Sequence, residues 1–87
     1  MEYYVYIVQC ADESLYTGIT NDLERRMGQH NGAVPGGAKY TLGRSPVSLV
    51  YTEACDSKSE ALKRESSIKK LSRTKKMELI HGLQKRA

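Results

Sequence analysis

The chain has 87 residues, of which 28% are charged and 39% hydrophobic, with six Tyr but no Phe or Trp. This length predicts a single domain over residues 1–87, and no apolar run approaches the roughly 18 residues of a membrane-spanning helix. The N-terminus lacks a basic region followed by an apolar segment, and Cys10 and Cys55 lack metal-ligand spacing. We therefore expect a cytoplasmic protein with reduced, buried thiols.

Charge is divided unevenly along the chain. Residues 1–57 carry four Lys and Arg against seven acidic residues, whereas residues 58–87 carry ten against three. A basic half of this kind indicates a surface that faces a polyanion such as DNA. A solvated helical surface, in which Lys only maintains solubility, explains the same composition equally well.

Residues 4–10 are rich in β-branched and aromatic side chains, which predicts a strand, and apolar residues at odd and even positions indicate burial on both faces. Residues 11–14 supply a turn, and residues 15–20 form a second strand. Gly18 in this strand would allow a ligand or another backbone to come close.

Tyr6 and Tyr16 lie on these two strands. They share one face of the sheet only if the turn between the strands has an odd number of residues. A three-residue turn over residues 12–14, with Cys10 opposite Tyr16, satisfies this condition. A two-residue turn would place the tyrosines on opposite faces.

A helix should begin at Asn21, which forms a variant of the capping box with Glu24 three residues later. Arg26 and His30 are four residues apart and therefore share a face of that helix. Two sheet tyrosines beside an arginine and a histidine form a group suited to a phosphate. Taken singly, a strand Tyr is more often a packing residue and a helix Arg more often faces solvent.

Residues 31–46 contain four Gly and two Pro without a hydrophobic period, which predicts a loop. Its charges are Lys39 and Arg44, both positive, and Gly36 and Gly37 would let backbone N–H groups approach an anion. A substrate-binding loop and a plain connector remain equally good interpretations. Residues 47–52 then form a third strand.

Ser57 and Glu60 form a capping box that starts a helix running to about Leu71. Glu65 lies within the apolar stripe of this helix, where a carboxylate is costly unless it is paired or binds a metal. The structural alternative is a Glu at the edge of the stripe, paired with Lys69 at i+4. The stripe consists of Ala61, Leu62, Ile68 and Leu71.

Five positive charges fall within residues 68–76, where Ser72 or Thr74 can cap a last helix. We expect these charges to bind nucleic acid without sequence preference. They are Lys69, Lys70, Arg73, Lys75 and Lys76.

Taken together, the motifs resemble those of the GIY-YIG nuclease superfamily, and the match covers nearly the whole chain. The features that carry it are Tyr4-Val5-Tyr6, Tyr16-Thr17-Gly18 ten residues later, Arg26 and His30, and Glu65 in an Ala-Leu-x-x-Glu-x-x-Ile-Lys context. The chain is most similar to small stand-alone bacterial members. It also resembles the N-terminal domain of the excision-repair nuclease and the catalytic subunit of the eukaryotic structure-specific nuclease.

The resemblance implies an α+β (α/β) fold with a three-stranded antiparallel sheet flanked by about three helices. It implies a metal-dependent endonuclease that hydrolyses DNA phosphodiester bonds in repair or recombination, with Mg²⁺ or Mn²⁺ as cofactor. By position, Tyr6, Tyr16, Arg26 and His30 are the catalytic residues and Glu65 is the metal ligand. Lys39 and Arg44 join the five basic residues of 68–76 as candidate DNA contacts.

Three alternatives stay open at this point. The protein could act only with a partner protein that supplies substrate affinity, or it could be a nucleic-acid-binding module that keeps the fold without cutting. It could also be a plain interaction domain with vestigial motifs. A pure binder has no use for Glu65, which repels phosphate unless a metal intervenes. Retention of Glu65 together with Arg26 and both tyrosines favours the nuclease.

Overall fold

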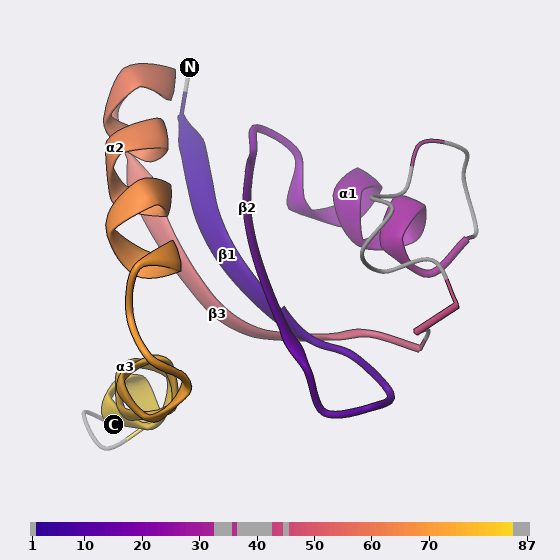
Figure 1. Cartoon of the computed structure of the whole chain (residues 1–87). Helices are drawn as coiled ribbons and strands as arrows, with labels where there is room; N and C mark the ends of the chain where they lie inside the picture. The colour runs from indigo at the N-terminus through magenta and orange to yellow at the C-terminus, as the bar shows by residue number, and fades with distance from the viewer. Residues whose placement is uncertain (1, 33–35, 37–42, 45, 85–87) are drawn as a thin grey trace.

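The computed structural model describes residues 2–32, 36, 43–44 and 46–84. In this part of the chain, three antiparallel strands form one sheet in the order β2-β1-β3, and three helices accompany it (Figure 1). This confirms the expected fold class. The elements are β1 (Tyr3–Gln9), β2 (Leu15–Thr20), α1 (Leu23–His30), β3 (Ser48–Cys55), α2 (Lys58–Lys69) and α3 (Arg73–Gln84).

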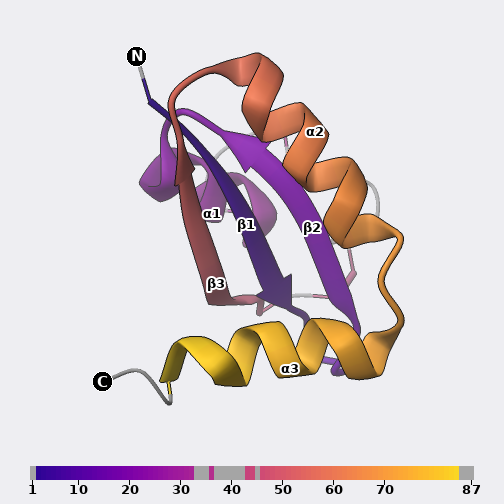
Figure 2. The same cartoon turned by 90° about the vertical axis from the view of Figure 1, so that its left-hand side faces the viewer.

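The central strand β1 is buried on both faces, as its composition predicts. Val5 and Ile7 point to one face, where they meet side chains of α2 and α3, including the fully buried Ile68. Tyr6 and Val8 point to the other face, which α1 covers. Figures 1 and 2 show α2 and α1 on opposite sides of the sheet, with α3 crossing its end. Complete burial of a side chain such as Ile68 stabilises the fold by about 2–3 kcal/mol.

The predicted apolar stripe of α2 is only half correct. Ala61 and Ile68 are fully buried, but Leu62 and Leu71 are 46% and 36% exposed. Helix α2 ends at Lys69, two residues earlier than expected, so Leu71 lies in the connection to α3 and no longer follows the helical period.

The β1–β2 hairpin places Tyr6 and Tyr16 on the same face, as predicted. Its register pairs Tyr6 with Gly18 and Val8 with Tyr16, so the predicted pairing of Cys10 with Tyr16 is wrong by two residues. The connection is odd in length but has five residues, 10–14. It is closed by hydrogen bonds from Cys10 N to Ser14 O (2.8 Å) and from Glu13 N to Cys10 O (2.9 Å).

Strand β3 starts one residue later and ends three residues later than expected. Its register against β1 shifts between Ile7, which pairs with Tyr51, and Val8, which pairs with Leu49. The extra β3 residue at this irregularity changes which face the strand presents. Tyr51 therefore joins the core beneath α2, whereas Val47, just before the strand, joins the core beneath α1.

Capping side chains fix where the helices begin. Helix α1 is capped by Asp22, whose Oδ1 accepts from Arg25 N at 3.1 Å, and not by Asn21 as predicted. Thr20 Oγ1 accepts from Asp22 N at 3.0 Å, which ties the end of β2 to Asp22 and leaves it in the capping position. Ser57 caps α2 as expected by accepting from Glu60 N at 3.2 Å.

Helix α3 starts after Ser72, whose Oγ accepts from Lys75 N at 3.2 Å. The end of α1 is tied to the start of β3, because Asn31 Oδ1 accepts from Val47 N at 2.7 Å. Within the described part of the chain, none of the helices has the length and apolar character needed to cross a bilayer.

Candidate active site

Tyr6, Arg26 and His30 form a hydrogen-bonded group between the sheet and α1. Arg26 Nε donates to the Tyr6 hydroxyl oxygen at 3.0 Å, and the same hydroxyl lies 2.8 Å from His30 Nε2. Tyr6 and His30 are each only 1% exposed. The structure therefore joins Tyr6 to two helix residues that follow it by 20 and 24 positions, and it buries the Tyr6 and His30 side chains while Arg26 stays half-buried.

Tyr16 completes this group from the neighbouring strand. Its ring centroid lies 5.3 Å from that of His30, in an edge-on arrangement, and 6.4 Å from that of Tyr6. Unlike Tyr6, Tyr16 is only half-buried. All four predicted catalytic side chains thus gather on the α1 face of the sheet.

Gly18 makes room for this arrangement. The Tyr6 ring lies directly over Gly18, so a Cβ at that position would come within 2.6 Å of the Tyr6 hydroxyl oxygen. The sequence suggested that a ligand or another backbone approaches Gly18, but the structure shows that a tyrosine ring does.

Burial controls the protonation of the group. Burial raises the pKa of Tyr6 above its usual value of 10.0; the hydrogen bond and positive charge of Arg26 oppose this, and Tyr16 and Glu65 add to it. Burial, and then the positive charge of Arg26, lower the pKa of His30 from 6.5 to about 4. At neutral pH Tyr6 is therefore a neutral phenol and His30 a neutral imidazole.

Arg26 stays charged in this setting. Burial disfavours its cation, but hydrogen bonds and charge interactions with Tyr6 and Tyr16 outweigh this and raise the pKa of Arg26. Because Tyr6 accepts a hydrogen bond from Arg26, we infer that the Tyr6 proton points to an unprotonated His30 Nε2.

Two further residues hold the Arg26 guanidinium, and neither was predicted from the sequence to contact it. Arg26 Nη1 donates to Gln29 Oε1 at 2.8 Å and to the carbonyl oxygen of Gly36 at 3.0 Å. The i,i+3 spacing of Arg26 and Gln29 on one helix was a usable signal. No sequence signal distinguishes the carbonyl of Gly36 from its neighbours, because every residue of a loop carries one.

Glu65 lies on α2, across the sheet from α1. Its side chain is 18% exposed and pairs with Lys69 Nζ at 3.4 Å, which is the structural alternative considered for it. Its charge still contributes to raising the pKa of Tyr6, so Glu65 lies within electrostatic range of the catalytic group. The described residues contain no cluster of three or more His, Cys, Asp or Glu side chains that could hold a metal ion.

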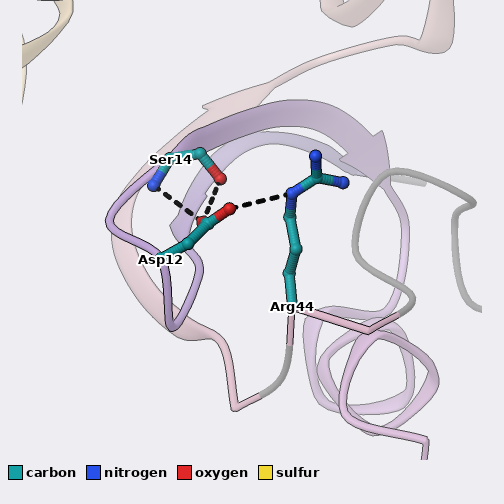
Figure 3. A network of polar contacts seen from close by, with 3 residues as sticks. All are labelled: Asp12, Ser14 and Arg44. Atoms are coloured by element: carbon teal, nitrogen blue, oxygen red, sulfur yellow. Dashed lines mark hydrogen bonds and ion pairs between the residues drawn. The ribbon is translucent and has the colours of Figure 1, made fainter.

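Arg44 is engaged with the hairpin turn. Its Nε donates to Asp12 Oδ2 at 3.0 Å, and its carbonyl oxygen accepts from Ala11 N at 2.8 Å. Figure 3 shows Asp12 between Arg44 and Ser14. Hydrogen bonds from Ser14, and then Arg44, lower the pKa of Asp12. A phosphate would therefore compete with Asp12 for Arg44. Lys39 lies outside the described residues.

The basic residues of 68–76 lie at the end of α2 and the start of α3. Arg73 and Lys76 line a depression of about 210 Å³ together with Ser14 and Leu15 of the hairpin. Lys69 pairs with Glu65, and Lys75 pairs with Glu78 at 3.6 Å. Lys70 is exposed. This basic surface is therefore on the α2 side of the sheet, opposite Arg26.

Comparisons with known proteins show the family of this chain. A model of the GIY-YIG catalytic domain matches residues 2–78. A UPF0213 protein of Natronomonas pharaonis is 56% identical over 79 residues, which are 91% of this chain and 91% of that protein. A UPF0213 protein of Clostridium perfringens is 58% identical over 77 residues, which are 88% of this chain and 81% of that protein.

Solved structures are similar along nearly the whole chain. The solution NMR structure of a UPF0213 protein from Bacillus halodurans is 49% identical, with a TM-score of 0.59 over 93% of this chain and 84% of that one. That of a protein from E. faecalis is 33% identical, with a TM-score of 0.65 over 97% and 88%. On these matches, the chain belongs to the GIY-YIG catalytic domain family and, within it, to the small UPF0213 proteins.

Proposed function

We propose that this protein is a metal-dependent endonuclease that hydrolyses DNA phosphodiester bonds. The observation that supports it best is the Arg26 guanidinium, which Tyr6, Gln29 and Gly36 hold through hydrogen bonds of 2.8 to 3.0 Å. These bonds leave the two N–H donors of Nη2 and the permanent positive charge to meet a phosphate oxygen. Because the guanidinium is already fixed, it stabilises the charge of a phosphoryl transition state without reorganising.

The two tyrosines have different tasks in this proposal. Tyr6 is 1% exposed and already bonded to Arg26 and His30, so it positions the guanidinium. Tyr16 is more exposed than Tyr6, since it is only half-buried. Its hydroxyl is therefore the one that orients the water that attacks phosphorus.

His30 fixes the orientation of the Tyr6 hydroxyl, because its unprotonated Nε2 accepts the hydroxyl hydrogen. Burial, and then the charge of Arg26, lower the pKa of His30 to about 4, so the imidazole keeps this acceptor at neutral pH. A phosphate bound to Arg26 offsets only the second cause, so His30 becomes somewhat more basic when substrate is present.

Glu65 is the residue that would hold a divalent metal. One carboxylate fits Mg²⁺, which keeps several waters and completes its shell with substrate phosphate oxygens, so the lack of a ligand cluster among the described residues agrees with such a site. When bound, the metal would supply positive charge against the phosphate. Its arrival requires Glu65 to release Lys69, an exposed partner that separates at little cost.

Cleavage of branched, flap and single-stranded DNA in Mg²⁺ or Mn²⁺ tests the proposal, with Glu65→Gln beside wild type. Glu78→Gln is the matched control, because Glu78 is also a helical Glu paired with a Lys, but on α3 and 61% exposed. We expect Glu65→Gln to lose metal-dependent cleavage while metal-free DNA binding stays equal or becomes tighter. Glu78→Gln should behave as wild type.

The same assay separates the alternatives. A wild-type protein that binds every substrate but cuts none in either metal would be a nucleic-acid-binding module. Wild-type cleavage by Glu65→Gln, with Mg²⁺ still required, would show that the metal is held elsewhere. Cleavage that appears only on adding cell extract to purified protein would indicate a partner that supplies substrate affinity.

A further inference from the structure

An open cleft of about 570 Å³ lies beside the candidate active site. Its residues come from the segment where the end of β2 leads into α1, and Figure 1 shows the course of that segment. All of its described lining residues are polar, so the cleft suits a hydrated polar ligand. The lining residues are Thr20, Asn21, Asp22, Arg25, Arg26 and Gln29.

Arg25 is the feature of this cleft that the catalytic group does not use. It is exposed, and its side chain makes no hydrogen bond or ion pair with the residues that the structure describes. The carboxylate in the cleft, Asp22, is occupied in capping α1, where it accepts from Arg25 N at 3.1 Å. The helix N-terminus offsets part of its charge. The cleft therefore presents two guanidinium groups, one fixed and one available.

We propose that this cleft binds the nucleotide next to the scissile phosphate and that Arg25 contacts the phosphate of that nucleotide. This inference rests on the endonuclease function proposed above, which places the scissile phosphate at Arg26. Arg25 and Arg26 are consecutive residues that line the same cleft, so a strand that leaves Arg26 along the cleft meets Arg25 with its next phosphate. Arg suits this task because its fork matches phosphate oxygens.

Metal-free DNA binding tests the contact independently of cleavage. The affinity of a labelled DNA duplex is measured by fluorescence anisotropy at several salt concentrations. Arg25→Ala should lower the slope of log affinity against log salt by about 0.9, which is the value of one phosphate contact. Arg25→Lys keeps the positive charge, so its slope should stay close to that of wild type. Lys63→Ala, which removes an exposed cation on α2 across the sheet, should leave the slope unchanged.

An Arg25→Ala slope equal to that of wild type would overturn the inference. So would an equal loss in Lys63→Ala, since it would show a diffuse charge effect and no specific contact. If wild type proves unable to cut DNA, the endonuclease proposal fails, while the slope still decides whether the cleft holds a phosphate.

Where cleavage is observed, Arg25→Ala should raise KM and leave kcat near the wild-type value, because this contact is the same in the ground and transition states. Arg26→Ala should instead lower kcat. A lowered kcat with unchanged KM in Arg25→Ala would place Arg25 at the reacting centre and contradict the role proposed for it.

Discussion

Substituting Gly18 by Ala should displace the buried hydroxyl of the candidate active site. A Cβ at position 18 would lie 2.6 Å from the Tyr6 hydroxyl oxygen, 2.8 Å from Tyr6 Cζ and 3.1 Å from Tyr16 Cε2. Ordinary contacts begin near 3.4 Å, so the Tyr6 hydroxyl must retreat by about 0.8 Å. It has little freedom to do so, because Arg26 and His30 hold it at 3.0 and 2.8 Å.

The energetic cost follows from what this movement disturbs. Overpacking a buried site costs about 1–3 kcal/mol. Weakening the two hydrogen bonds of Tyr6, one of them to a charged group, adds about 1–2 kcal/mol. Ala also lowers the backbone entropy of the unfolded chain, which stabilises the folded state by roughly 0.5 kcal/mol and offsets part of this cost. We therefore expect Gly18→Ala to lower the free energy of unfolding by about 2–4 kcal/mol.

Urea unfolding of Gly18→Ala beside Gly82→Ala measures this effect. Gly82 lies on α3, where no described atom beyond its chain neighbours and the local helix backbone comes within 4 Å of the position of an added Cβ. Its substitution should therefore be neutral or stabilise the helix by up to about 1 kcal/mol. Where cleavage is observed, the displaced Tyr6 should also cost roughly 100-fold in rate. A Gly18→Ala protein within about 0.5 kcal/mol of wild type would refute the reasoning, because the Tyr6 ring would then have space to move.

Three further outcomes are expected. Because the pKa of His30 is about 4 when folded and about 6.5 when unfolded, the unfolded chain binds the extra proton between these values. The free energy of unfolding should thus fall by about 3 kcal/mol as pH drops from about 6.5 to about 4. His30→Gln should lose most of this dependence in urea titrations, and an unchanged slope would count against a buried neutral imidazole. Arg26→Lys keeps the charge but cannot make the bonds to Tyr6, Gln29 and Gly36 and still reach a phosphate, so kcat should fall about 100- to 1,000-fold; an unchanged kcat would exclude the proposed role. Neutralising the five basic side chains of 68–76 should lower the salt slope of DNA binding by up to about 0.9 per lost contact, and an unchanged slope would show that DNA does not bind that surface.

The sequence was enough to predict that Tyr6, Tyr16, Arg26 and His30 lie close together, because their faces are set by short-range geometry. The common sheet face of Tyr6 and Tyr16 follows from the two-residue period of strands. The common helix face of Arg26 and His30 follows from helical spacing. The register of the hairpin did not follow, because the length of its turn depends on the backbone conformation of residues such as Glu13, which adopts a φ of 68°. Periodicity fixes which face a residue takes, but not which residue it meets.

Other errors arose where tertiary contacts decide between similar residues. Asn21 and Asp22 are both good helix caps, and the bond between Thr20 and Asp22 selects the second. Leu62 was placed in the core by spacing, but the face of α2 that meets the sheet is too narrow to include it. Glu65 as a metal ligand stays a prediction, and its place across the sheet depends on how α2 packs, which the sequence of α2 does not specify.

The position of β1 between two strands means that the two tyrosines have unequal mechanical support. Tyr6 is on the strand that is hydrogen-bonded on both sides, whereas β2, which carries Tyr16, pairs on one side only in the described sheet. Backbone amides of β1 should therefore exchange with solvent deuterium last, and those along the outer edge of β2 much earlier. The candidate site thus has a rigid side formed by β1 and a more mobile side formed by β2. In the proposed endonuclease, small excursions of β2 would adjust Tyr16 to phosphodiester backbones of different shape, while the guanidinium bonded to Tyr6 stays in place.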